Sequence, residues 1–278
     1  MQNENKKFIF FGTPDVAKKT LDILKENGYT PCCIVTSPDA PSGRGMIQTA
    51  SPVSVWAEKN FIDCIKPTII DDEFINTTSE YNADLFIVVA YGKILPEKLI
   101  KLPKLETINI HYSLLPKYRG ASPVEQALLN GDKVTGVSIQ QMVYKMDAGD
   151  IITELEIPID ITNTKSTLRE KLINKGGELL VSTLPDIFNK KITLKKQDEK
   201  LATRCKKIKK EDGLINIDGD DWENYNKYRA YENWPSVFFM KDNKRIKITK
   251  AVFSDEKFVI IKVIPEGKKE IDYNIFNK

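Results

Sequence analysis

Histidine is almost absent from this 278-residue sequence, in which His111 is the only one. The four cysteines, Cys32, Cys33, Cys64 and Cys205, include no CxxC pair, and a zinc site could draw on no histidine except His111. No apolar run approaches the ~18 residues that span a bilayer, and no secretory segment is evident. We therefore expect reduced structural cysteines, no metal centre, no membrane partner and a cytoplasmic location.

Several motifs of other enzyme classes are also missing. The turn Gly12-Thr13-Pro14 after the first predicted strand has one glycine, so it lacks the GxGxxG pattern of dinucleotide binding. The sequence has no serine elbow and no cysteine in a basic pocket, which argues against a covalent intermediate. Direct transfer between two bound substrates fits these absences better.

The composition is that of an ordinary soluble protein, with 41% apolar and 29% charged residues. Short apolar runs separated by helical patterns predict an α/β fold with a mostly parallel sheet. We predict strands at 7–11, 31–36, 84–90, 107–110, 135–142 and 151–158. We predict helices at 14–28, 51–60, 71–81, 122–130 and 166–188, the last kinked or ended near Pro185.

The remainder of the chain predicts a mobile loop and a second domain. Residues 37–48 are rich in Pro, Gly and Ser and place Arg44 between two glycines, a composition typical of a functional loop. We divide the chain into a catalytic domain at 1–188, a basic linker at 189–206 and a small β-rich domain at 207–278. Residues 201–278 hold 17 lysine and arginine residues against 13 acidic ones. This surplus fits either a polyanionic partner or a solvated surface.

Three polar residues at predicted strand ends carry the candidate chemistry. Asn109 and His111 are two apart in a strand, so their side chains share one face. The amide can donate to an oxygen that gains charge, and the imidazole can donate or move a proton. Asp147, in the turn between two later strands, could pair with the imidazole and favour its charged form. A lone histidine is more often structural, but the three groups together predict catalysis.

Two segments resemble the folate-dependent formyltransferases. The first is Asn109-x-His111-x-Ser113-Leu114-Leu115-Pro116, followed by Arg119-Gly120, and the second runs from Gly136-Val137 to Met146-Asp147-Ala148-Gly149-Asp150. Further segments narrow the resemblance to the branch that acts on methionyl-tRNA: residues 11–14, 38–45, 89–96 and 233–235. The resemblance covers about residues 7 to 240.

The resemblance implies a Rossmann-like catalytic domain and a shortened, OB-like β-rich C-terminal domain. It implies 10-formyltetrahydrofolate as the donor, initiator methionyl-tRNA as the acceptor, and a monomer. By likeness, Asn109 and His111 stabilise the oxyanion, while Asp147 holds His111 charged and helps take the proton from the attacking amine. The implied folate contacts are Tyr91, Gly92, Ser113, Leu114, Leu115 and Pro116. The expected tRNA contacts are Arg44, Lys195, Lys196, Lys206 and Lys207.

The chain departs from the family pattern in two places. Met46-Ile47-Gln48 stands where the family usually has lysines, and residues 258–277 omit about a hairpin of the barrel. Three alternatives remain: a formyltransferase for another amine, such as a nucleotide-linked amino sugar, a formyltetrahydrofolate hydrolase, or a non-catalytic RNA-binding protein. The basic linker and the Arg44 loop favour tRNA over a small acceptor.

Overall fold

The computed structural model describes residues 6–42 and 45–277. By its internal contacts the chain forms two compact units. Unit 1 comprises residues 1–119, 136–156 and 171–203, and unit 2 comprises residues 120–135, 157–170 and 204–278. The units therefore alternate along the chain, whereas the predicted boundaries at 188 and 206 divide it linearly. Those boundaries stay a prediction.

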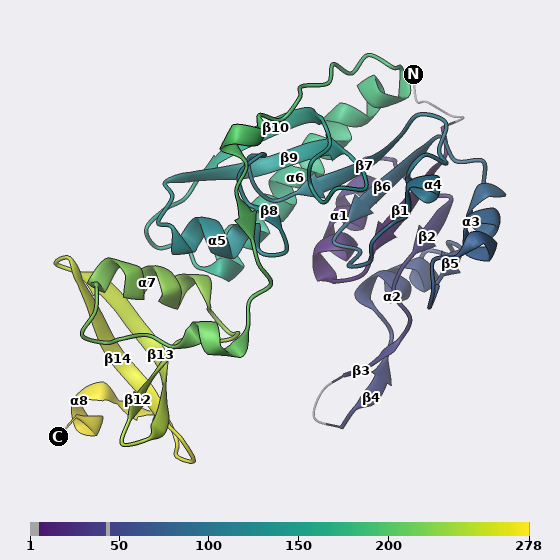
Figure 1. Cartoon of the computed structure of the whole chain (residues 1–278). Helices are drawn as coiled ribbons and strands as arrows, with labels where there is room; N and C mark the ends of the chain where they lie inside the picture. The colour runs from purple at the N-terminus through teal and green to yellow at the C-terminus, as the bar shows by residue number, and fades with distance from the viewer. Residues whose placement is uncertain (1–5, 43–44, 278) are drawn as a thin grey trace. The chain divides into compact units, whose positions relative to one another are not determined.

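Unit 1 is built on a seven-stranded sheet in the order β10-β9-β7-β6-β1-β2-β5 (Figure 1). Its strands are β1 (Phe8–Gly12), β2 (Cys33–Val35), β5 (Cys64–Ile65), β6 (Leu85–Val89), β7 (Glu106–His111), β9 (Val134–Gln141) and β10 (Ile151–Pro158). The pairs from β7 through β6, β1 and β2 to β5 are parallel, and β9 runs antiparallel to β7. The predicted, mostly parallel sheet is thus confirmed.

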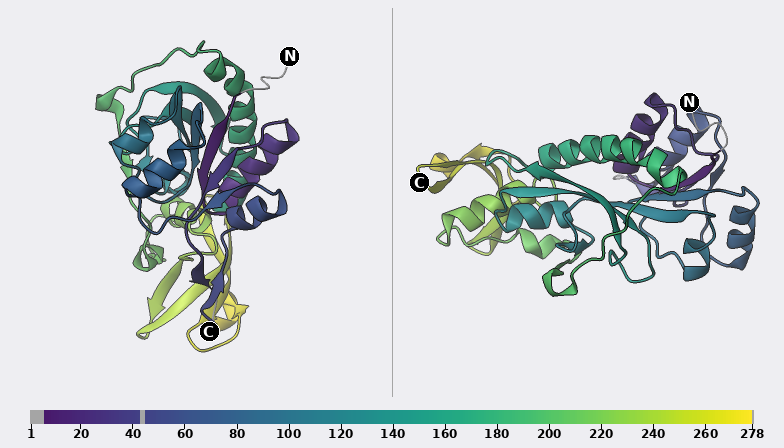
Figure 2. Two further views of the ribbon diagram at one scale, coloured as in Figure 1. Left: turned by 90° about the vertical axis from the view of Figure 1, so that its right-hand side faces the viewer. Right: turned by 90° about the horizontal axis from the view of Figure 1, so that it is seen from above.

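Helices cover both faces of this sheet. The helices of the unit are α1 (Asp15–Glu26), α2 (Pro52–Lys59), α3 (Asp72–Ser79), α4 (Glu97–Ile100) and most of α6 (Lys165–Phe188). A Cβ on Gly177 of α6 would lie 2.5 Å from Ile23 of α1, so these two helices share a face. Phe74 and Leu99, from α3 and α4, pack with Ile9 and Phe11 on the opposite face. Figure 2 shows α1 and α6 on one side of the sheet and α3 and α4 on the other.

One local prediction for unit 1 was wrong. The segment predicted as a loop at 37–48 contains a hairpin of β3 (Ala40–Ser42) and β4 (Ile47–Thr49) around residues 43–44, which are not described. The long helix α6 agrees with its prediction, since it runs from Lys165 to Phe188 and ends three residues beyond Pro185.

Unit 2 contains a four-stranded antiparallel sheet in the order β12-β13-β14-β15. The strands of this sheet are β12 (Phe238–Lys241), β13 (Lys244–Ser254), β14 (Lys257–Pro265) and β15 (Ile271–Asp272). The helices of the unit include α5 (Pro123–Leu129), α7 (Asp221–Ala230) and α8 (Tyr273–Phe276). The short strands β8 (Arg119–Gly120) and β11 (Arg204–Cys205) lie where the chain passes between the units. The predicted class, a parallel-sheet domain with a small β-rich C-terminal domain, is confirmed.

Helix α7 was missed in the sequence because its buried face is polar. Asn224, Asn226 and Arg229 are each at most 6% exposed, so no apolar stripe marks the helix. The guanidinium of Arg229 donates to Asn226 and lies 5.4 Å above the ring of Trp222. The cap Asp220, with Glu223 three residues later, is the signal that could have revealed the helix.

Candidate active site

The polar site lies on the face of the unit 1 sheet that also packs against α3 and α4. Val88, which belongs to that core face, pairs with Asn109, and parallel partners point to the same side. Across the antiparallel pair, Asn109 lies opposite Gln140 and His111 lies opposite Ser138. The alternation of β7 and β9 therefore gathers four polar side chains on one patch of the sheet.

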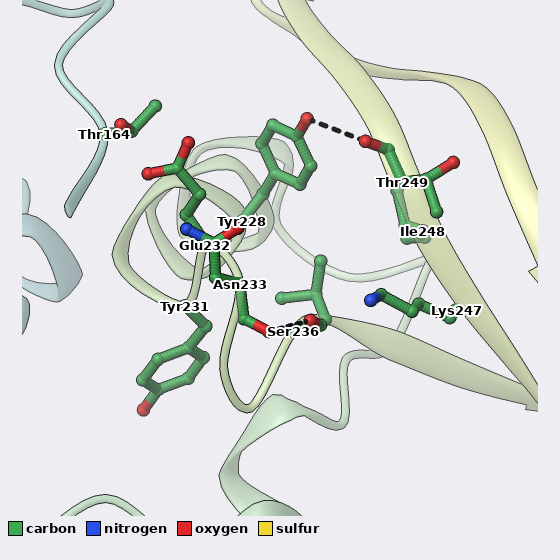
Figure 3. Close-up of a pocket in the computed structure, with 10 residues that line it drawn as sticks. Thr164, Tyr228, Tyr231, Glu232, Asn233, Ser236, Lys247, Ile248 and Thr249 are labelled. Carbon is green, nitrogen blue, oxygen red and sulfur yellow. Dashed lines mark hydrogen bonds between the residues drawn. The ribbon is translucent and has the colours of Figure 1, made fainter. Parts of the chain in front are cut away.

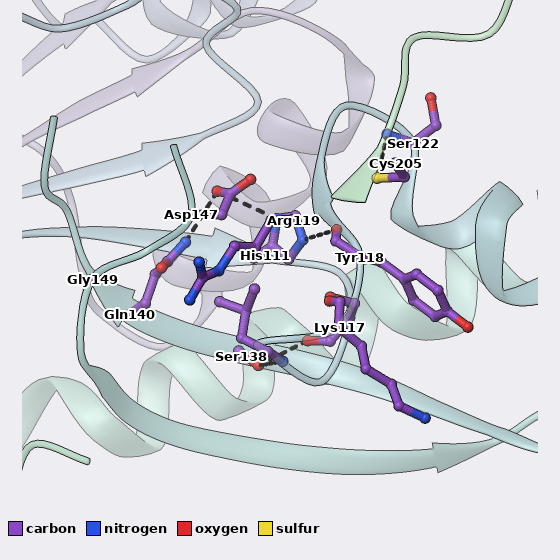
Figure 4. Close-up of polar contacts among 12 residues, drawn as sticks. His111, Lys117, Tyr118, Arg119, Ser122, Ser138, Gln140, Asp147, Gly149 and Cys205 are labelled. Carbon is purple, nitrogen blue, oxygen red and sulfur yellow. Dashed lines mark hydrogen bonds and ion pairs between the residues drawn. The ribbon is translucent and has the colours of Figure 1, made fainter. Parts of the chain in front are cut away.

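The imidazole of His111 is 6% exposed and has protein partners at both nitrogens (Figure 4). Nε2 lies 2.9 Å from the carbonyl oxygen of Tyr118, and a carbonyl can only accept, so Nε2 carries a proton. Nδ1 faces Oδ1 of Asp147 at 3.6 Å. A second proton on Nδ1 would therefore make an ion pair with Asp147.

Asp147 is held by its backbone and by a neighbouring amide. Its φ of 51° lies in the left-handed region, which costs a non-glycine residue about 1 kcal/mol or more. Nε2 of the buried Gln140 donates to Oδ1 of Asp147 at 3.1 Å. Gly149 must be glycine, because a Cβ there would lie 1.9 Å from the carbonyl oxygen of Gln141. The turn that contains Asp147 and Gly149 is thus held by the Gln140 amide on one side and by close packing against Gln141 on the other.

The side chain of Asn109 differs from its neighbours in the site. It is half-buried, and within the described part of the chain its amide makes no hydrogen bond to protein. An amide without a protein partner beside an imidazole and a carboxylate is suited to donate to an oxygen that gains charge.

Ser138 fixes the turn that follows His111. Its hydroxyl is fully buried and accepts a hydrogen bond from the backbone N–H of Leu115 at 3.0 Å. The same oxygen lies 2.8 Å from the carbonyl of Ser113 and 2.9 Å from Oε1 of Glu154, to either of which it can donate. Gly136 permits this packing, since a Cβ there would lie 2.4 Å from Leu114.

The predicted folate residues fall into two groups. Ser113 to Pro116 form the turn beside the site, where Leu114 and Pro116 are half-exposed. The side chain of Tyr91 is instead 2% exposed in the core, 5.6 Å from the ring of Phe11. Among the described residues its hydroxyl has no hydrogen-bond partner, and burial raises the pKa of the Tyr91 phenol to about 12. Gly92 follows it with a φ of 85°.

The predicted tRNA residues are spread over the chain. Lys195 and Lys196 belong to unit 1, and Nζ of Lys195 lies 3.7 Å from Glu154. Lys206 and Lys207 are exposed in unit 2. Arg44 lies outside the described residues. The roles assigned to all the predicted site residues stay predictions.

Sequence reasoning missed Gln140 and Gln197. Ser138 and Gln140 alternate with the apolar Val137 and Ile139 in β9, and that alternation was the available signal for a polar inner face. Nothing in the sequence marks Gln197, which lies in the segment predicted as a linker. Its side chain nevertheless donates to the carbonyl oxygens of Asp147 and Gly149.

No metal site competes with this interpretation in the residues that the structure describes. None of the described His, Cys, Asp and Glu side chains form a group of three that could hold a metal ion. The expectation of a metal-free enzyme stays a prediction. Across the same residues, no helix is long and apolar enough to cross a membrane.

A separate cavity of about 230 Å³ lies within unit 2 (Figure 3). Its lining includes Tyr228, Glu232, Asn233 and Thr249, and the hydroxyl of Tyr228 donates to the Thr249 carbonyl at 3.5 Å. It contains none of the predicted catalytic, folate or tRNA residues. The candidate chemistry is therefore assigned to the polar site of unit 1.

The fold and this site define a formyltransferase, and the chain belongs to the formyl transferase family. The family's formyl transferase model matches residues 6–184, and its C-terminal domain model matches residues 207–259. This confirms the resemblance drawn from the two sequence signatures.

Relatives that the chain resembles in sequence are named methionyl-tRNA formyltransferase. It is 38% identical over 247 residues to the methionyl-tRNA formyltransferase of Sulfurihydrogenibium sp., covering 88% of this chain and 79% of the relative. It is 40% identical over 243 residues to the methionyl-tRNA formyltransferase of Thermotoga maritima, covering 87% and 78%.

Solved structures share the fold at lower identity. The methionyl-tRNA formyltransferase of Clostridium thermocellum matches with a TM-score of 0.61 and 17% identity, over 96% of this chain and 99% of that one. An N-formyltransferase of Helicobacter canadensis, in complex with folinic acid and dTDP-3-aminofucose, matches with a TM-score of 0.67 and 21% identity, over 92% and 95%.

Proposed function

We propose that this protein transfers the formyl group of 10-formyltetrahydrofolate to the α-amino group of initiator methionyl-tRNA, for translation initiation. The observation that carries the proposal is the placement of Asn109 and His111 on one face of the sheet, with Asp147, in the turn between β9 and β10, 3.6 Å from His111. The identity of about 40% to methionyl-tRNA formyltransferases supports the choice of acceptor. The reaction runs in the cytoplasm, and the protein acts as a monomer.

A folate-derived donor suits the surroundings of the site. The half-exposed side chains of Leu114 and Pro116, in the turn that follows His111, offer apolar surface to a flat ring system. The turn that carries them is fixed by the buried hydroxyl of Ser138. A pocket with apolar walls and a few fixed polar groups is the usual form of such a site. The family membership of the chain supports the same donor.

The geometry gives each catalytic residue a distinct task. The Asn109 amide has no partner among the described residues, so it donates to the formyl oxygen as that oxygen gains charge. Both nitrogens of His111 face protein acceptors in this orientation, so the ring would act on the oxyanion through the charge that a proton on Nδ1 brings, rather than through a hydrogen bond. The carboxylate of Asp147 accepts the proton that the attacking amine loses.

The test is transfer of formyl from 10-formyltetrahydrofolate to initiator methionyl-tRNA, with uncharged tRNA and elongator methionyl-tRNA as controls. We expect transfer that is selective for the initiator. In His111→Ala, transfer should collapse while tRNA affinity stays nearly unchanged, because the ring is only 6% exposed and offers little surface to RNA.

Two outcomes would contradict the proposal in different ways. Folate binding without transfer to methionyl-tRNA would point to another amine, for instance on a nucleotide-linked sugar. Release of formate without any amine acceptor would instead identify a hydrolase.

A further inference from the structure

Residues 195–203, here named the strap, are hydrogen-bonded to the rest of unit 1 along their length. The backbone groups of Lys195 and Ile151 exchange two hydrogen bonds of 2.8 and 2.9 Å. At the other end, the Thr203 carbonyl accepts from the backbone N–H of Arg119 at 2.9 Å. The Thr203 hydroxyl accepts from the N–H of Tyr118 at 2.8 Å. A segment whose composition predicted a free linker is therefore part of the folded unit.

The strap contacts the backbone beside both members of the His111–Asp147 pair. Tyr118, whose carbonyl accepts the Nε2 hydrogen bond of His111, is the residue that donates to Thr203. On the other side, Nε2 of Gln197 donates to the carbonyl oxygen of Asp147 at 2.9 Å. One short segment thus supports both the loop that contacts His111 and the turn that carries Asp147.

Gln197 is the centre of this arrangement. Its Nε2 also donates to the carbonyl oxygen of Gly149 at 2.6 Å, so it spans the turn that carries Asp147. Its Oε1 accepts from Nε and Nη2 of Arg119 at 3.0 and 2.7 Å. The guanidinium is only 3% exposed and reaches Glu199 at 2.8 Å with the same Nη2. A side chain held at both ends by buried groups has little freedom to move.

The turn needs such support. Asp147 adopts the left-handed conformation that a non-glycine residue avoids, and the surroundings must hold it there. The Gln140 amide fixes the carboxylate, whereas Gln197 fixes the backbone on which the carboxylate stands.

We propose that Gln197 is a positioning residue of the active site, which holds the Asp147 turn so that the carboxylate faces His111. It does not touch the reacting atoms and acts through the carbonyls of Asp147 and Gly149. The kinetic part of the test rests on the proposed function, but the geometric part does not.

Substitution by glutamate separates positioning from packing. Gln197→Glu keeps the size of the side chain and an oxygen for Arg119, yet its carboxylate cannot donate to the two carbonyls. We expect kcat to fall about 10- to 100-fold, the range that misplacement of a catalytic group produces. KM for both substrates should stay within about threefold, because the substrate-binding residues are untouched. Gln197→Ala should lose at least as much activity.

The matched control is Leu201→Ala in the same strap. Leu201 is 61% exposed and uncharged, so its removal should leave kcat and the thermal unfolding temperature at wild-type values. Thermal unfolding of Gln197→Glu shows whether the variant is folded, and kcat is referred to folded protein.

The single histidine supplies a readout that is independent of any substrate. In tag-free protein, the imidazole ¹⁵N signals come only from His111. We expect the signals in Gln197→Glu to move towards those of Asp147→Asn, while those of Leu201→Ala overlap with wild type. Wild-type ring signals in folded Gln197→Glu would overturn the proposal, whatever the acceptor. If wild-type protein formylates no tRNA, the function fails and the ring signals still decide the role of Gln197.

Discussion

Nδ1 of His111 faces Oδ1 of Asp147 across 3.6 Å, while Nε2 of the same ring donates to a backbone carbonyl. The backbone contact fixes which nitrogen is left for the carboxylate. Removing the charge of Asp147 without changing its shape therefore isolates the electrostatic part of the pair.

Asp147→Asn should lower kcat by about 10² to 10⁴, the usual contribution of a positioned acid or base. The asparagine oxygen can still accept the hydrogen bond from Gln140, so the free energy of unfolding should change little. Steady-state kinetics and urea unfolding measure the two quantities. The control is Asp150→Asn in the same turn, and an equal fall in kcat there would refute a special role for Asp147.

Ser138→Ala should lower the free energy of unfolding by about 1 to 3 kcal/mol, because it leaves the buried N–H of Leu115 without its acceptor. Affinity for the folate should also weaken, since the same turn is assigned to the donor. Urea unfolding and folate titration test this. Ser182→Ala, on the exposed side of α6, should stay within about 0.5 kcal/mol of wild type. Equal effects of the two variants would contradict the assignment.

Tyr91→Phe should stabilise the protein by about 1 kcal/mol at neutral pH, because the buried hydroxyl of Tyr91 has no hydrogen-bond partner in residues 6–42 and 45–277. Folate affinity should be unchanged, since that hydroxyl lies inside the core. If the hydroxyl contacts the donor instead, the affinity will fall.

The same substitution should change the response of stability to alkaline pH. The pKa of Tyr91 rises from 10.0 to about 12 in the folded protein, so between these pH values the unfolded chain loses a proton that the folded chain keeps. Stability therefore falls as pH rises through this window. Tyr91→Phe should show a shallower fall, and the exposed Tyr144→Phe should match wild type.

Replacing Lys206 and Lys207 together by alanine should weaken tRNA binding and leave kcat at saturation nearly unchanged. Each lost phosphate contact lowers the slope of log K against log salt by about 0.9, so a reduction of about 1 to 2 is expected. Filter binding at several salt concentrations measures it. The control replaces Lys190 and Lys191, two lysines that are likewise consecutive in the sequence, by alanine. An equal reduction of the salt slope in that variant would indicate a general effect of net charge.

The sequence was sufficient to bring Asn109 and His111 together, because the alternation of side chains along a strand depends only on neighbouring residues. Asn109 and His111, two apart in β7, had to share a face once the strand was recognised. The contact of His111 with Asp147 depends on a turn between β9 and β10, so the sequence could name Asp147 as a possible partner of the imidazole but strand alternation could not bring the two together. Gln197 could not be found, because a polar, basic segment carries no pattern that distinguishes a braced chain from a free one.

The same limit explains the errors in the fold. The hairpin of β3 and β4 has strands of three residues, too short for a visible alternation. Helix α7 buries amides and an arginine, whereas the search for helices relies on apolar side chains.

The alternation of the two units along the chain bears on how the protein can be cut. Within unit 2, α5 packs on α7, and Trp222 lies against Gly131, although about ninety residues of sequence separate them. A fragment made from residues 207–278 would therefore leave the inner surface of α7 exposed to water. A protease that cleaves near residue 204 would release no intact module, because two of the three segments of unit 2 would remain covalently attached to unit 1. Unit 2 therefore needs all three of its chain segments to fold, and residues 207–278 alone could not be moved to another protein as an independent domain.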